Sequence, residues 1–82
     1  MINHYFELRT PRNTKVVTFS VDNITDSEVE EVNAFIKDVT IEMLDSEFFT
    51  MLNEECNGDL KEYIKINLED ILYRKVKISF ID

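Results

Sequence analysis

The chain has 82 residues, and its 17 Asp and Glu residues against 9 Lys and Arg give a formal net charge of −8. This length and a hydrophobic content of 44% predict one folded domain covering residues 1–82 rather than a disordered chain. The composition excludes a membrane-spanning helix, because no stretch approaches about 18 uncharged apolar residues. It also excludes a multi-cysteine metal site or an internal disulfide, because Cys56 is the only cysteine.

Two segments near the N-terminus are rich in aromatic and β-branched residues and predict a β-hairpin. They are residues 5–9 and 15–21, separated by a turn that contains Pro11 and Asn13. In the second segment hydrophobic residues fall on alternate positions, which predicts one buried face of the sheet. The residues on that face are Val17, Phe19 and Val21.

A long helix is predicted next, beginning at Thr25-Asp26 and running to about Asp45. Thr25 and Glu28 have the spacing of a capping box, in which each side chain bonds the backbone of the other residue. Hydrophobic residues at helical spacing form a stripe that predicts the side covering the sheet. The members of this stripe are Val29, Val32, Ile36, Val39 and Met43.

Two further helices are predicted in the next part of the chain. The first begins with Ser46 as its cap and runs through Asn57, and Gly58 supplies a helix stop. The second follows Asp59, whose spacing to Glu62 is again that of a capping box. Its hydrophobic residues recur at helical spacing over three turns. They are Leu60, Tyr63, Ile64, Leu68, Ile71 and Leu72.

The last residues alternate again and predict a final strand that joins the hairpin's sheet, with Val76, Ile78 and Phe80 on one side and Lys75 and Lys77 on the solvent side. The expected order is therefore β-β-α-α-α-β. This is an α+β domain with an antiparallel sheet covered by two or three helices.

Two of the predicted helices have a rival interpretation as strands. Hydrophobic residues also alternate within residues 39–43, so the long helix has an alternative end near Lys37 followed by a short strand. Residues 62–68 alternate in the same way. The helix is preferred there because a strand leaves Ile71 and Leu72 unexplained.

Few residues qualify for catalysis or metal binding. His4 precedes the first strand, where a catalytic base is hard to hold in place. Cys56 lies beside two glutamates, which raise a thiol pKa and make it less nucleophilic. Residues 22–28 offer oxygen ligands, but Ile24 occupies the third position and the glycine of a calcium loop is missing. We therefore predict a protein that is not an enzyme and has no catalytic residue, metal or cofactor.

The acidity is concentrated in the middle of the chain, where residues 22–59 carry twelve carboxylates and one lysine. Such a surface disfavours direct binding to nucleic acid, whose phosphates need a basic face. On the long predicted helix the acids share a sector beside the core stripe, together with outward-facing hydrophobic residues. We call this set the acidic ridge and predict that it binds a partner. The acidic ridge consists of Glu28, Glu31, Phe35, Asp38, Ile41, Glu42 and Asp45.

The acidic ridge spans about 25 Å along the helix, with charges spaced on the scale of phosphates in a nucleic acid. This spacing predicts a polyanion mimic whose partner is a basic protein, in particular an enzyme that processes nucleic acids. A simpler interpretation is that the ridge is only a solvated helix face. In that case Phe35 and Ile41 pack under the neighbouring helix.

The composition also carries a resemblance, because the chain is small, acidic, almost free of Gly, Pro and Ala, and rich in Ile and Asn. It is similar to small proteins of phages and mobile elements of low-GC bacteria. These include inhibitors of host nucleases and of CRISPR or restriction defences, several of which are DNA mimics. The resemblance implies a non-enzymatic anti-defence inhibitor.

The alternative function is a self-assembling structural or regulatory module, a homodimer or adaptor, in which Ile41, Phe48 and Phe49 pair the protomers. The first ten residues lack the basic start and long apolar run of a secretory signal, and the single cysteine suits a reducing compartment. We therefore expect a cytoplasmic protein, in the host cell if a phage encodes it, with no membrane partner.

Overall fold

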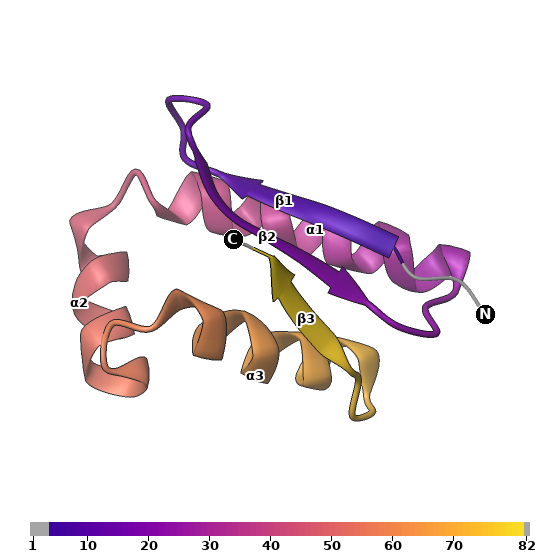
Figure 1. The fold of residues 1–82 in the computed structure, drawn as a ribbon. Coiled ribbons are helices and arrows are strands. Elements are labelled where there is room, and N and C mark those ends of the chain that lie inside the picture. The colour runs from indigo at the N-terminus through magenta and orange to yellow at the C-terminus, as the bar shows by residue number, and fades with distance from the viewer. Residues whose placement is uncertain (1–3, 82) are drawn as a thin grey trace.

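In the computed structural model, which describes residues 4–81, three strands and three helices form one small α+β domain (Figure 1). The strands are β1 (His4–Arg9), β2 (Lys15–Val21) and β3 (Ile78–Ile81), and the helices are α1 (Asp26–Glu42), α2 (Ser46–Cys56) and α3 (Leu60–Leu72). The order β-β-α-α-α-β and the antiparallel pairing confirm the predicted fold.

The central strand of the sheet is β2, which pairs with β1 on one side and with β3 on the other. Phe19 lies opposite Phe6 of β1 and Phe80 of β3, with ring centroids 5.4 and 5.9 Å apart. Phe19 is fully buried, so this row of aromatic rings forms the centre of the inner face. Val17 and Val21 are also buried, which confirms the predicted alternation.

The opposite face of the sheet carries polar and hydrophobic side chains side by side. Tyr5 is 63% exposed there, and Ile81 is 43% exposed. Thr18 lies between Glu7 and Ile81 on the neighbouring strands, and its hydroxyl oxygen is buried without a hydrogen-bond partner among the described residues. An unpaired buried hydroxyl destabilises the fold, since folding removes its hydrogen bonds to water.

The hairpin turn between β1 and β2 is closed by its own hydrogen bonds. The Asn13 amide donates to the Thr10 carbonyl at 2.8 Å, and Asn13 adopts a φ of 66°, a left-handed conformation that asparagine tolerates. The strand register shifts next to Arg9, which places a β-bulge beside the turn. The resulting tip, residues 10–14, projects beyond the sheet (Figure 1).

The long helix α1 lies on the inner face of the sheet and packs against β1 and α3 (Figure 1). The Thr25 hydroxyl accepts the Glu28 amide at 3.3 Å, and the Glu28 carboxylate accepts the Thr25 amide at 3.0 Å, which confirms the capping box. Val32 and Val39 are buried on the same stripe. The chain is therefore helical from residue 39 to Glu42, and the strand alternative is wrong.

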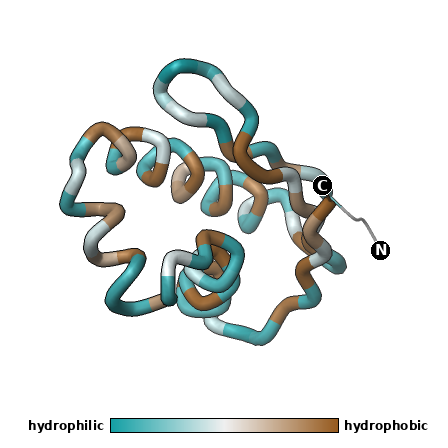
Figure 2. The backbone as a smooth tube through the Cα atoms, turned by 60° about the vertical axis from the view of Figure 1, so that its left-hand side comes forward, coloured by the Kyte–Doolittle hydropathy of each residue, from teal (hydrophilic) through white to brown (hydrophobic). Residues whose placement is uncertain are grey.

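The helices α2 and α3 pack against each other, and α3 also packs against α1. Figure 2 shows hydrophobic positions interspersed with hydrophilic ones in the helical segments. The buried hydrophobic residues of α2 and α3 join those of the sheet in one core. Residues 62–68 are helical, as preferred from the sequence. The residues that α2 and α3 contribute to the core are Phe48, Leu52 and Cys56 of α2 and Ile64, Leu68 and Leu72 of α3.

Within residues 4–81, no helix is both long and apolar enough to cross a membrane.

The boundary between α1 and α2 differs from the prediction. The first helix ends at Glu42 instead of about Asp45, and Asp45 replaces Ser46 as the cap of α2. The reason is local, because the Asp45 carboxylate accepts the Glu47 amide at 3.0 Å and satisfies a free donor at the start of α2. Asp45 thereby leaves helical geometry and turns the chain.

The other element ends are close to their predicted positions. The second helix ends at Cys56, one residue earlier than expected, since Asn57 is already left-handed with a φ of 53°. The stop at Gly58 is confirmed: its φ is 77°, and an added Cβ would lie 2.8 Å from the Asn53 side-chain oxygen. The last strand begins at Ile78, so the prediction that Val76 belongs to it is wrong.

Candidate functional site

The acidic ridge follows the boundary between α1 and α3, rather than facing solvent along its whole length. Three of its members contact α3 or the residues just beyond it. Phe35 and Glu42 contact Tyr63 of α3, and Glu28 contacts Arg74. They lie at the edge of the core stripe, where a neighbouring helix reaches them. The ridge therefore divides into residues that hold α3 in place and residues that remain open to a partner.

Glu28 belongs to the first group. Its two carboxylate oxygens accept Arg74 Nη2 at 2.9 Å and Arg74 Nε at 3.0 Å, and Arg74 Nη2 also donates to the Asn23 carbonyl at 3.0 Å. The hydrogen bonds from Arg74, followed by that from the Thr25 amide, lower the pKa of Glu28 from 4.5 to about 2. The charge of Glu28 is thus already neutralised within the protein.

Phe35 also belongs to this group. Its ring stacks on that of Tyr63 with centroids 6.2 Å apart, and the side chain is half-buried against the core. The expectation that Phe35 points away from the core is therefore wrong, and the alternative that it packs under the neighbouring helix is confirmed. The cause is the position of α3, which covers this flank of α1.

Glu31, Asp38 and Ile41 form the open part of the ridge. Both carboxylates are exposed, and no base pairs with either of them among the described residues. Ile41 is 56% exposed, so its predicted outward direction is confirmed. An exposed hydrophobic side chain between unpaired acids supplies contact area as well as charge.

The end of the ridge opens into a groove of about 450 Å³ at the junction of α1, α2 and α3. We call it the acidic groove, because three carboxylates line it together with hydrophobic and aromatic side chains, which we call its aromatic wall. The carboxylates are Glu42, Asp45 and Glu47, and the wall consists of Ile41, Phe48, Met51 and Tyr63.

The aromatic wall of the acidic groove is fixed by contacts between helices. The rings of Phe48 and Tyr63 meet edge to face with centroids 5.5 Å apart. The Tyr63 hydroxyl donates to the Glu42 carboxylate at 3.4 Å. Burial, followed by the charge of Glu42, raises the pKa of Tyr63, so this hydroxyl stays protonated and remains a donor.

This arrangement suits a cationic side chain. Lysine and arginine have hydrophobic stems that pack on apolar walls while the charged end stays near solvent or carboxylates. The carboxylates of Glu42, Asp45 and Glu47 form no ion pair with a base in the described part of the chain, so a cation from outside relieves their mutual repulsion.

The predicted site contained three of the seven residues that line this groove: Ile41, Glu42 and Asp45. The four that it lacked lie on α2 and α3, which the turn after α1 and the position of α3 bring to the groove. They are Glu47, Phe48, Met51 and Tyr63. One signal was available: a tyrosine on a core-facing stripe needs a partner for its hydroxyl.

The remaining candidate residues take structural positions. Cys56 is buried, and burial, with smaller contributions from Glu55 and other nearby carboxylates, raises the pKa of its thiol, as expected for a core cysteine. Of the basic cluster after α3, Arg74 binds Glu28, while Lys75 and Lys77 are exposed ahead of β3. No group of three or more metal-ligating side chains occurs within residues 4–81.

The chain matches no family model, no curated protein and no solved structure. The function is therefore argued from the geometry and charge of its own residues. Of these, the acidic groove and the open part of the ridge carry acidic side chains that form no ion pair with the bases of the described residues, 4–81.

Proposed function

We propose that this protein is a non-enzymatic binding protein whose acidic groove and open ridge bind a basic protein, an enzyme that processes nucleic acids. The observation that carries the proposal is the acidic groove itself, in which three carboxylates that pair with no base of residues 4–81 lie around an aromatic wall. Glu31 and Asp38 extend the negative charge along α1.

The proposed mechanism is occupation of the partner's nucleic-acid site. A net charge of −8 attracts a basic surface over a distance of several ångströms and accelerates encounter. A lysine or arginine that normally contacts phosphate then enters the acidic groove, while Ile41 packs beside it. Substrate is excluded because both ligands need the same basic side chains.

The compositional resemblance to small phage and mobile-element proteins supports a more specific version, an anti-defence inhibitor that acts on a host nuclease as a DNA mimic. Such an inhibitor works in the host cytoplasm. The buried, single Cys56 suits that reducing compartment, because it forms no disulfide.

Affinity capture with two matched variants tests the proposal. Tagged protein retains partners from host lysate at low salt, and these are eluted with rising salt or with duplex DNA. The site variant combines Glu31→Gln, Asp38→Asn and Glu42→Gln. The control variant removes three charges elsewhere, by Glu54→Gln, Glu69→Gln and Asp70→Asn.

The expected result is a basic nucleic-acid enzyme that the wild type and the control retain, that the site variant loses, and that duplex DNA displaces. Equal capture by all three proteins would refute the site. A partner that stays bound at high salt and in excess DNA would refute mimicry, since charge-driven binding weakens as salt screens it.

A further inference from the structure

A second groove lies on the other side of the α1–α2 connection, between that connection and the hairpin tip. Its volume is about 470 Å³. Two large hydrophobic side chains of its lining are exposed to solvent, Leu44 by 74% and Phe49 by 49%. We call this groove the apolar corner. Its lining residues are Thr10, Pro11, Arg12, Thr14, Met43, Leu44 and Phe49.

The fold does not require these exposed side chains. Leu44 lies in the turn between α1 and α2, and neither Leu44 nor Phe49 belongs to the core. The Phe49 ring meets the Phe48 ring edge to face, with centroids 5.4 Å apart. Adjacent exposed hydrophobic residues of this kind mark an interaction surface.

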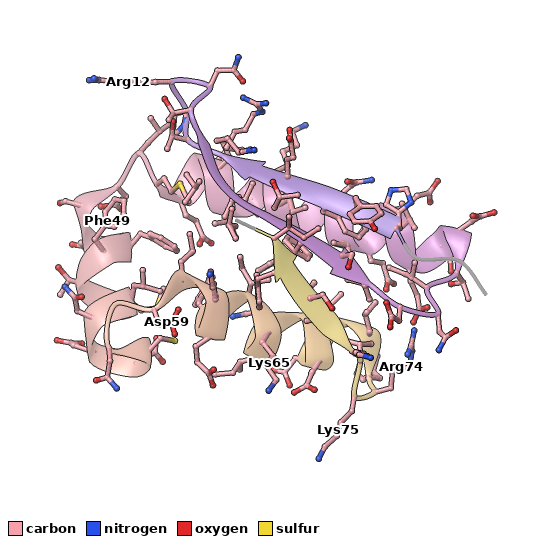
Figure 3. The ribbon with its side chains drawn as sticks, in the orientation of Figure 1. Arg12, Phe49, Asp59, Lys65, Arg74 and Lys75 are labelled. Atoms are coloured by element: carbon pink, nitrogen blue, oxygen red, sulfur yellow. The ribbon has the colours of Figure 1, made fainter. Side chains whose placement is uncertain are left out.

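Charge at the apolar corner identifies its partner. Arg12 stands at the tip of the hairpin, exposed and without an ion-pair partner among residues 4–81, and Figure 3 places it at the same end of the molecule as Phe49. The acidic groove is adjacent along the chain, because Glu42 and Asp45 of its lining flank Met43 and Leu44 of the apolar corner. The surface thus carries opposite charges on its two flanks. A purely basic partner meets repulsion from Arg12, whereas a second copy of the chain offers Arg12 a groove lined by carboxylates.

We propose that two copies of this protein pair through the apolar corner about a two-fold axis, with Arg12 of each copy entering the acidic groove of the other. A two-fold axis brings the same patch of both copies together, so a surface that is positive on one flank and negative on the other is complementary to itself. Leu44 and Phe49 then lie at the centre and lose their exposure to water.

This dimer goes beyond the proposed function and is tested on the isolated protein. Because Arg12 and an outside cation compete for the same carboxylates, the dimer is a form in which the partner-binding groove is occupied. The dimer and the complex with a basic enzyme exclude each other.

Sedimentation equilibrium of the full chain over about 5–500 µM at low salt measures the pairing. We expect a monomer–dimer equilibrium that weakens about tenfold or more with Leu44→Asn and with Arg12→Glu. One matched control is Lys75→Glu, at the opposite end of the molecule from Arg12 (Figure 3). The other is Tyr73→Asn, two residues before Lys75, which removes a 94% exposed aromatic ring. Both controls are expected to change the dissociation constant less than about twofold.

A charge exchange tests the two-fold arrangement directly. Two variants are needed: Arg12→Glu, and a double variant with Glu42→Lys and Glu47→Lys, which makes the net charge of the groove positive because only Asp45 stays acidic. Each variant places like charges across both contacts of its own dimer. An equimolar mixture of the two variants restores attraction at both contacts, so we expect a mixed dimer stronger than either variant alone. A monomer at about 500 µM, a dimer unaffected by Leu44→Asn, or a mixture no stronger than its components would overturn the proposal. Circular dichroism of each variant verifies that the fold is retained.

Discussion

Replacing Glu28 by glutamine separates a residue that holds the fold from residues that are open to a partner. Glutamine keeps an oxygen that accepts the Thr25 amide in the capping box, but it loses the charge that binds Arg74 at 2.9 and 3.0 Å. The expected result is a less stable protein that still binds its partner through the open ridge.

The magnitude follows from the pKa of Glu28, which the hydrogen bonds from Arg74, followed by that from the Thr25 amide, lower from 4.5 to about 2. At about 1.36 kcal/mol per pKa unit the full displacement corresponds to about 3 kcal/mol. The side chains of Arg74 and Glu28 are 38% and 16% exposed, so solvent screening reduces the effect to about 1 kcal/mol. In a domain of this size that lowers the melting temperature by about 4–8 °C.

The direction of the pKa shift determines how the stability of the protein changes with pH. A carboxylate whose pKa is lowered by folding stabilises the protein fully above pH 4.5, and this contribution disappears as the pH falls toward 2. Urea unfolding at pH 7 and near pH 2 measures both limits. The variant is expected to be less stable than the wild type at pH 7 and nearly equal to it near pH 2.

The control is Glu31→Gln, which removes the same charge from an exposed position on the same helix. It is expected to change the free energy of unfolding by less than about 0.5 kcal/mol. A Glu28→Gln variant that is as stable as the wild type at pH 7 would contradict this role of Glu28. So would a loss of unfolding free energy that is as large near pH 2 as at pH 7.

Three further substitutions test the fold by urea unfolding. Thr18→Val removes an unpaired buried hydroxyl and is expected to raise the free energy of unfolding by about 1 kcal/mol; a decrease would show that the hydroxyl has a partner. Tyr73 has a left-handed backbone with φ 55°, which asparagine tolerates better, so Tyr73→Asn is expected to raise the free energy of unfolding by about 0.5–1 kcal/mol. An unchanged free energy would show that Tyr73 is not strained. Phe19→Ala costs about 3–5 kcal/mol, so a cooperative transition near the wild-type midpoint would contradict its central position.

Local patterns were sufficient to predict most of the fold. The capping box at Thr25, the stop at Gly58 and the alternation around Phe19 each depend on neighbours in sequence, and the structure confirms all three. The end of α1 was less predictable, because Asp45 serves equally well within a helix or as the cap of the next one. Its hydrogen bond to the Glu47 amide decides between them.

The candidate site depended on contacts that periodicity does not contain. Helical spacing shows which residues share a side of α1, but not that α3 lies along that side. Glu28 meets Arg74, which is 46 residues away in the chain, and Phe35 and Glu42 meet Tyr63. These long-range contacts divide the predicted ridge, and sequence alone gives no sign of which acids they neutralise.

The strand order has a consequence for how the protein is made. The central strand β2 pairs with β3, and all three helices lie between them in the chain. During synthesis the hairpin is made before the helices and β3, so one edge of β2 and one side of the Phe19 ring stay uncovered until β3 follows. Closing so long a loop slows folding. The nascent chain therefore carries an unpaired edge of β2 until β3 has been made, which is a period when it is open to aggregation and to chaperones.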